Sequence, residues 1–146
     1  MASLILRCYL CGLGLVLLLQ GVAAIAYKFI PVELPALWDR ALRTDLTHAS
    51  VHIGWGILLI FLISTSSSNR FLNSIRYWIS AKQQTEILGF IFGGFYLSLG
   101  FLGIAVRYPL GMMLDRGENL FHLLAGAIAW GLVFYSQISR PRPHFN

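Results

Sequence analysis

Charged residues are unusually few in this sequence. Only 12% of its 146 residues are Asp, Glu, Lys or Arg, about half of the roughly 25% that soluble domains carry. A chain with so few charged groups cannot build a water-facing surface, which excludes a soluble globular enzyme and a disordered chain. Cysteine is also scarce, because Cys8 and Cys11 are the only two. Two cysteines are too few for a secreted domain held together by disulfides.

Long apolar runs make up much of the sequence, and 57% of the residues are hydrophobic. A helix needs about 20 residues to cross a hydrocarbon core. Four stretches are long enough: residues 4–26, 47–66, 86–106 and 118–137. They are apolar on every side instead of alternating, which predicts helices and not membrane strands. We therefore expect an all-α polytopic membrane protein with four transmembrane helices, forming a single domain over residues 1–146.

The first apolar run shares features with a cleavable signal peptide. Arg7 precedes it, and Ala24-Ile25-Ala26 resembles a cleavage site. We interpret the run as a transmembrane helix that stays on the protein.

Two connections between the runs are amphipathic. Residues 35–43 and 69–80 each place apolar side chains at helical spacing with charged or polar side chains opposite. Pro35 suits the first turn of a helix. We predict two short interfacial helices, with Trp38 and Trp78 at the headgroups of opposite membrane faces.

Basic residues give a small orientation signal. The side of both termini and the middle connection holds six Lys and Arg residues, and the other side holds five. The positive-inside rule therefore predicts that both termini face the cytoplasm.

A short internal repeat links the second and fourth runs. The matched pairs are Asp45 with Asp115, His52 with His122, and Gly56 with Gly126. Upstream, the segments that begin at Gly21 and Gly103 end the first and third runs in a similar way. This pattern indicates two helical hairpins of the same orientation, related by an axis along the membrane normal. The two histidines would then lie at matching depth, about 6–8 Å below one membrane face.

Histidines form the candidate functional site. His52 and His122 lie inside the second and fourth runs, and His48 lies one helical turn before His52. An ionisable side chain within a span is costly and usually faces the bundle interior. A neutral imidazole can bind the iron or magnesium of a tetrapyrrole, so all three are candidate cofactor ligands. The alternative is that each histidine bonds a backbone carbonyl, a serine or an asparagine in the bundle.

Metal and catalytic motifs are incomplete. His48 and His52 have the H-x-x-x-H spacing that can hold zinc, but the glutamate of H-E-x-x-H is absent and no third ligand is evident. We therefore expect no metal site. No nucleophile–base pair, phosphate loop or pair of carboxylates within a span is present either. The sequence thus predicts a protein that is not an enzyme and has no catalytic residues.

The remaining features have structural interpretations. Cys8 and Cys11 are expected to be small apolar residues of a membrane helix, and Gly89 and Gly93 a close-packing face. Asp115 and its acidic neighbours are expected to cap the fourth helix.

The chain resembles an uncharacterised family of small four-helix bacterial membrane proteins. The residues that carry the resemblance are His52-x-x-x-Gly56, Asn119-Leu120-x-His122-x-x-x-Gly126, Gly100 and Gly103. The likeness covers most of the chain. It implies the four-helix fold in a bacterial membrane and carries no activity.

We expect a non-catalytic accessory subunit of a larger photosynthetic or respiratory membrane complex, with other membrane subunits and lipids as partners and no nucleic acid. The tail, residues 139–146, has no hydrophobic periodicity, so a partner is expected to order it. The first alternative is a tetrapyrrole-binding or electron-transfer protein that uses His52 and His122, with chlorophyll, bacteriochlorophyll or haem as the cofactor. The second alternative is a small transporter or lipid-binding protein. The expected location is a bacterial inner membrane or a thylakoid-type membrane.

Overall fold

The computed structural model consists of helices, with no strand among the residues it describes. The long helices are α1 (Ala2–Tyr27), α3 (Leu46–Ser64), α5 (Ala81–Ala105) and α6 (Arg116–Ile138). Each is long and apolar enough to cross a membrane, which confirms the predicted all-α fold with four such helices. The described residues are 1–30, 33–64, 80–106 and 108–139.

Capping boxes set where two of the long helices begin. Ser80 accepts a hydrogen bond from the backbone of Gln83 before α5, and Asp115 accepts one from Glu118 before α6. α5 therefore starts five residues before the predicted position 86, because its first turn is polar and hydropathy alone does not detect it. The predicted capping role of Asp115 is confirmed.

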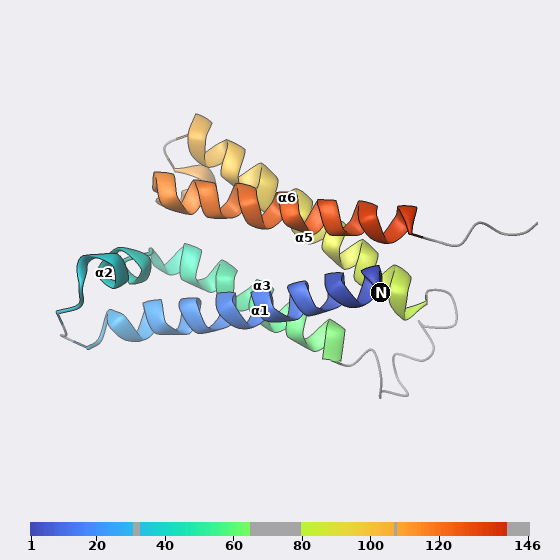
Figure 1. Ribbon diagram of the computed structural model, residues 1–146. Coiled ribbons are helices and arrows are strands. Elements are labelled where there is room, and N and C mark those ends of the chain that lie inside the picture. The colour runs from blue at the N-terminus through green and yellow to red at the C-terminus, as the bar shows by residue number, and fades with distance from the viewer. Residues whose placement is uncertain (31–32, 65–79, 107, 140–146) are drawn as a thin grey trace, which may run out of the picture.

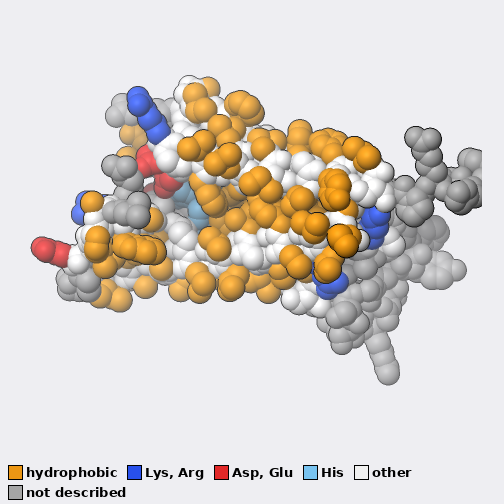
Figure 2. Space-filling model, in the orientation of Figure 1, with side chains coloured by type: hydrophobic (Ala, Val, Ile, Leu, Met, Phe, Trp, Pro, Cys, Tyr) orange, Lys and Arg blue, Asp and Glu red, His pale blue; other side chains and the backbone are white. Residues whose placement is uncertain are grey.

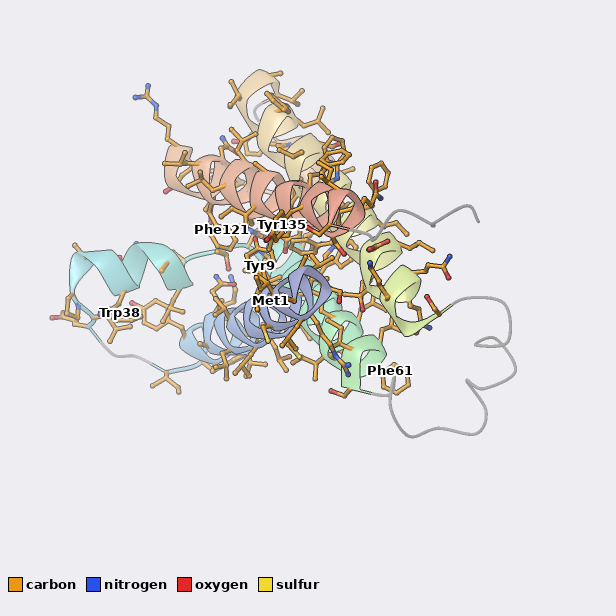
Figure 3. All side chains as sticks on the ribbon, turned by 45° about the vertical axis from the view of Figure 1, so that its right-hand side comes forward. Met1, Tyr9, Trp38, Phe61, Phe121 and Tyr135 are labelled. Atoms are coloured by element: carbon orange, nitrogen blue, oxygen red, sulfur yellow. The ribbon has the colours of Figure 1, made fainter. Side chains whose placement is uncertain are left out.

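Short helical segments lie between the long ones. α2 (Ala36–Leu42) occupies the predicted range 35–43, whereas almost all of the second predicted short helix, 69–80, lies outside the described residues. Trp38 stands on α2 at the edge of the molecule and is 62% exposed (Figure 3). A 3-10 turn, η2 (Pro109–Gly111), precedes α6 and was not expected from the sequence.

The long helices pack as two hairpins. α1 lies along α3, α5 lies along α6, and α1 also packs on α5 and α6 (Figure 1). The hydrophobic core runs between the hairpins, with Phe92 and Tyr96 as its largest fully buried side chains. The described ends of the chain lie together, opposite the end that holds α2 (Figure 1). The tail residues 140–146 lie outside the described residues.

Glycine contacts support the predicted repeat. A side chain at Gly56 of α3 would come within 2.7 Å of the carbonyl oxygen of Gly14 and the backbone nitrogen of Leu18. A side chain at Gly126 of α6 would come within 2.7 Å of the carbonyl oxygen of Gly93 and within 2.8 Å of the nitrogen of Leu97. Each hairpin is therefore closed by the same glycine contact, made by residues at matching positions.

These contacts correct one part of the predicted alignment. Gly14 and Gly93 stand 79 positions apart, and the same offset pairs Gly21 with Gly100 and not with Gly103. A Cβ at Gly21 would lie 2.7 Å from the carbonyl oxygen of Ala49, and one at Gly100 would lie 3.1 Å from that of Asn119, which matches Ala49 in the repeat. The sequence comparison failed there because it matched small residues at helix ends instead of the contacts that small residues permit.

Hydrophobic side chains cover the length of the bundle (Figure 2). Examples with more than half of their surface exposed are Leu19, Phe61, Phe101 and Leu124. Charged side chains gather at the two ends instead (Figure 2). This distribution is what a bilayer requires of a four-helix bundle.

Candidate functional site: a buried cluster of three histidines

The three candidate histidines meet between the two hairpins. His48 and His52 lie one turn apart on α3, and His122 comes from α6. One ring nitrogen from each can be chosen so that all three atoms lie within 4.8 Å of one another. All three side chains are buried, with exposed fractions of 1%, 5% and 0%. The structure thus brings together every histidine that the sequence analysis selected.

The rings contact each other directly. The Nε2 atoms of His48 and His52 lie 3.1 Å apart. The centroid of the His122 ring lies 5.5 Å from that of His48 and 6.0 Å from that of His52. Three imidazoles therefore share one small volume, with two nitrogens already at contact distance.

Polar groups stand behind the two α3 histidines. The Nδ1 atom of His52 lies 2.5 Å from the side-chain oxygen of Gln20 on α1. The Nδ1 atom of His48 lies 3.4 Å from the Oε1 atom of Glu118 on α6, without a hydrogen bond. An Nδ1–H that donates to Gln20 leaves the Nε2 lone pair of His52 directed into the cluster.

His122 has no such support. Neither of its ring nitrogens has a hydrogen-bond partner among the described residues, although the side chain is fully buried. A buried polar group without a partner costs about 1–3 kcal/mol. The alternative interpretation, in which each histidine bonds a backbone carbonyl, a serine or an asparagine, therefore does not fit His122, and the partner of His52 is a glutamine instead.

Aromatic rings cover the inner side of the cluster. The ring centroid of Tyr96 lies 5.2 Å from that of His122 and 6.4 Å from that of His52. Its hydroxyl is buried and has no hydrogen-bond partner among the described residues. Phe92 stacks on Tyr96 with centroids 4.3 Å apart and extends this aromatic layer toward the middle of the bundle.

A cavity of about 280 Å³ opens beside the cluster. The histidines line it together with Gln20 of α1, Ala41 of α2 and Phe121 of α6. Figure 3 shows Phe121 extending from α6 on the side that faces α1 and α2. Figure 2 shows histidine surface next to acidic side chains at the α2 end of the molecule. The cluster is thus buried within the protein but reachable from one end.

Asp45 fixes the beginnings of both segments that carry the histidines. Its Oδ1 atom accepts a hydrogen bond of 2.8 Å from the backbone nitrogen of His48. Its Oδ2 atom accepts one of 2.8 Å from the backbone nitrogen of Met113, shortly before α6. One carboxylate therefore connects the first turn of α3 to the segment that leads into α6.

Sequence reasoning missed the groups that complete the cluster. It found no third ligand for His48 and His52, and the structure provides His122 as a third imidazole beside them. It did not select Gln20 or Glu118 as site residues. The repeat contained the signal for Glu118, because position 118 matches position 48 at the same offset that pairs His122 with His52.

A scan of protein-family models found no match, and no curated protein or solved structure matched the chain.

Proposed function

We propose that this chain is an integral membrane protein that binds a transition-metal ion through His48, His52 and His122. The observation that carries the proposal is the meeting of three buried imidazoles, one of which has two unpartnered ring nitrogens. Imidazole is a ligand for Zn²⁺, Cu²⁺, Ni²⁺ and Fe²⁺. A bound ion would provide the partner that His122 lacks.

The distances are close to those of a metal site. Zinc binds imidazole nitrogen at about 2.0–2.1 Å, so neighbouring ligand atoms in a tetrahedral site lie about 3.3 Å apart. The Nε2 atoms of His48 and His52 are 3.1 Å apart. The largest separation in the group is 4.8 Å, so the third ring has to approach by about 1–2 Å. Rotation of side chains supplies a movement of that size.

The surrounding groups suit ligand histidines. A metal-bound histidine usually donates its other N–H to a carbonyl or carboxylate oxygen, which fixes the ring and its tautomer. Gln20 stands in that position behind His52, and Glu118 stands near it behind His48. The facing Nε2 atoms of His48 and His52 are hydrogen-bonded to each other at 3.1 Å, and a bound ion would replace that bond.

A bound ion would also join the two hairpins. α3 and α6 carry the histidines but are not a closely packed pair among the described helices. An ion held by residues from both helices would connect them at this end of the bundle. Ligand binding of this kind stabilises the folded state in proportion to its affinity.

Metal analysis of the purified chain tests the proposal. The protein in detergent is stripped with a chelator, titrated with Zn²⁺ or Co²⁺, and measured by calorimetry and by elemental analysis after gel filtration. We expect one ion per chain, and no bound ion once His52 and His122 are both replaced by leucine. Equal metal content in the wild type and the double variant would contradict the proposal.

Tetrapyrrole binding through His52 and His122 remains a separate prediction. The three rings contact one another, and within the part of the chain that the structure describes a macrocycle would approach them from the cavity beside Phe121. A visible absorption spectrum of native material distinguishes the two, because a tetrapyrrole gives intense bands and a bound Zn²⁺ ion gives none.

Membership of a larger complex is also a prediction. Purification from native membranes under mild conditions tests it, and recovery of the protein only as a free monomer would contradict it.

A further inference from the structure

The carboxylates around the cluster lie on one side of it. The cavity that holds the histidines is also lined by Asp115 and Glu118. The same two residues line a neighbouring hollow of about 580 Å³, together with Asp39 of α2 and Arg43, which follows the last residue of α2. The two spaces therefore meet at Asp115 and Glu118, between α2 and the start of α6.

This outer hollow, which we call the vestibule, is acidic. Its lining includes the carboxylates of Asp39, Asp115 and Glu118 and the guanidinium of Arg43. Arg43 is itself paired with Asp39, at 2.8 Å between Nε and Oδ1. Hydrogen bonds from Tyr27 and Arg43 hold the pKa of the Asp39 carboxyl below its usual range, so it is ionised at neutral pH. Because the carboxylates in this lining outnumber the guanidinium, the vestibule raises the local concentration of cations.

The opposite side of the cluster is packed. Tyr96 and Phe92 are each 0% exposed and fill the bundle toward its middle. Phe121, by contrast, lies at the cavity on the vestibule side and is 36% exposed. Within the described residues, the wide and charged approach to the histidines is therefore the one from α2 (Figure 2).

Glu118 stands where the two spaces meet. One of its oxygens accepts a hydrogen bond of 2.7 Å from the backbone nitrogen of Asp115, and the other lies 3.4 Å from Nδ1 of His48. Glu118 is thus a vestibule carboxylate that lies within 4 Å of a histidine of the cluster. His122 is fully buried and lines the same cavity, and its ring nitrogens have no hydrogen-bond partner among the described residues. A cation that passes Glu118 would therefore reach imidazole nitrogens that are able to bind it.

We propose that metal cations reach the histidine cluster from the α2 side through the vestibule, and that the Glu118 carboxylate is the last group they contact before the imidazoles. This inference rests on the proposed metal-binding function and adds the direction of access and a residue that controls the rate. A divalent cation leaves water in steps, and an anionic oxygen at the mouth replaces part of its hydration before the neutral imidazoles do.

Rapid mixing of the metal-stripped chain with Co²⁺ tests the path, because Co²⁺ bound to imidazole changes its visible absorption. The variant Glu118→Gln removes the charge and keeps an oxygen that can serve in the capping box of α6. We expect its association rate to fall about 10-fold at low ionic strength, with the difference shrinking as salt is added. The matched control is Glu33→Gln, an exposed carboxylate in a hollow that borders the vestibule at Arg43 and shares no lining residue with the histidine cavity. It should change the rate less than about 2-fold.

A steric variant gives a second readout. Ala41 of α2 lines the cavity, and Ala41→Trp would narrow the opening without altering a ligand. We expect Co²⁺ association and dissociation to slow together, with the affinity unchanged.

Each result has a defined meaning. If the wild type binds Co²⁺ and Glu118→Gln binds it just as fast, or Glu33→Gln is slowed equally, the path is wrong while the metal site stands. An unchanged association rate in Ala41→Trp also overturns the path. If the wild type binds no Co²⁺, the proposed function fails and the path fails with it.

Discussion

The two hairpins share a packing scaffold. Gly56 and Gly126 make matching contacts with the opposite helix of their own hairpin, and His52 and His122 lie one turn before these glycines. Helix pairs in a membrane need such small residues, because lipid provides no hydrophobic drive to hold helices together. The positions that close each hairpin are therefore the ones that both halves retain.

The two hairpins differ at the positions around the histidines. His48 of α3 corresponds to Glu118 of α6, and Gln20 of α1 corresponds to Leu99 of α5. His52 thus has a partner for its outer nitrogen, while His122 has none among the described residues. The matching glycine contacts bring two imidazoles to corresponding positions of the two hairpins, and the differences around them make one asymmetric site. Four experiments test this comparison.

Removal of the unsupported histidine should have the largest effect. We expect His122→Leu to weaken Zn²⁺ binding more than 100-fold. Loss of a residue that only supports a metal ligand typically lowers the affinity about 10- to 100-fold, and loss of a ligand should cost more. The metal-free protein should be as stable as the wild type or more stable, by about 1–3 kcal/mol, because an unpartnered buried group is gone. Calorimetry gives the affinity, and unfolding in a denaturing detergent mixture gives the stability. A large loss of metal-free stability would mean that His122 has a structural partner.

The equivalent glycines should respond alike. Gly56→Ala and Gly126→Ala would each place a methyl group against opposing backbone, so we expect each to cost about 1–3 kcal/mol of stability. Gly54→Ala and Gly131→Ala are matched controls, because no atom lies within 4 Å of the added carbon. They should be neutral or stabilising by about 0.5–1 kcal/mol, since alanine favours helix. Unequal losses of stability in Gly56→Ala and Gly126→Ala would show that the two hairpins are not packed in equivalent ways.

Copying the residue of the second hairpin into the first should have an intermediate effect. Gln20→Leu gives α1 the residue that α5 has at the matching position, and it removes the group behind Nδ1 of His52. We expect Zn²⁺ affinity to fall about 10- to 100-fold. Gln20→Glu, which restores an oxygen acceptor, should recover most of that loss. If leucine and glutamate behave alike in the titration, Gln20 does not orient the ring.

Exchange of the divergent pair should have the smallest effect. His48→Glu together with Glu118→His moves each group to the matching position of the other hairpin and keeps three histidines and one carboxylate. We expect Zn²⁺ affinity within about 10-fold of the wild type, with the loss of the α6 capping box costing about 1 kcal/mol of stability. Loss of binding in the double variant, with the fold intact, would show that the two positions are not equivalent.

Much of the fold follows from one-dimensional patterns. Hydropathy predicts four long helices because a span must be apolar along about 20 residues, a property that can be read without knowing any neighbour. The ends of α1, α3 and α6 came within two residues of the predicted ends within the described part of the chain. The start of α5 differed by five residues, because a capping box and not hydropathy determines it.

The candidate site could be predicted only in part. The sequence alone selected His48, His52 and His122, because an ionisable residue within an apolar run is conspicuous. It could not show that the three meet, since His122 is far from the others along the chain. Only the packing of α6 against α1 brings that ring to within 4.8 Å of the pair on α3. Gln20 and Glu118 join the site for the same reason: their roles depend on distances across helices, which no spacing along one helix encodes.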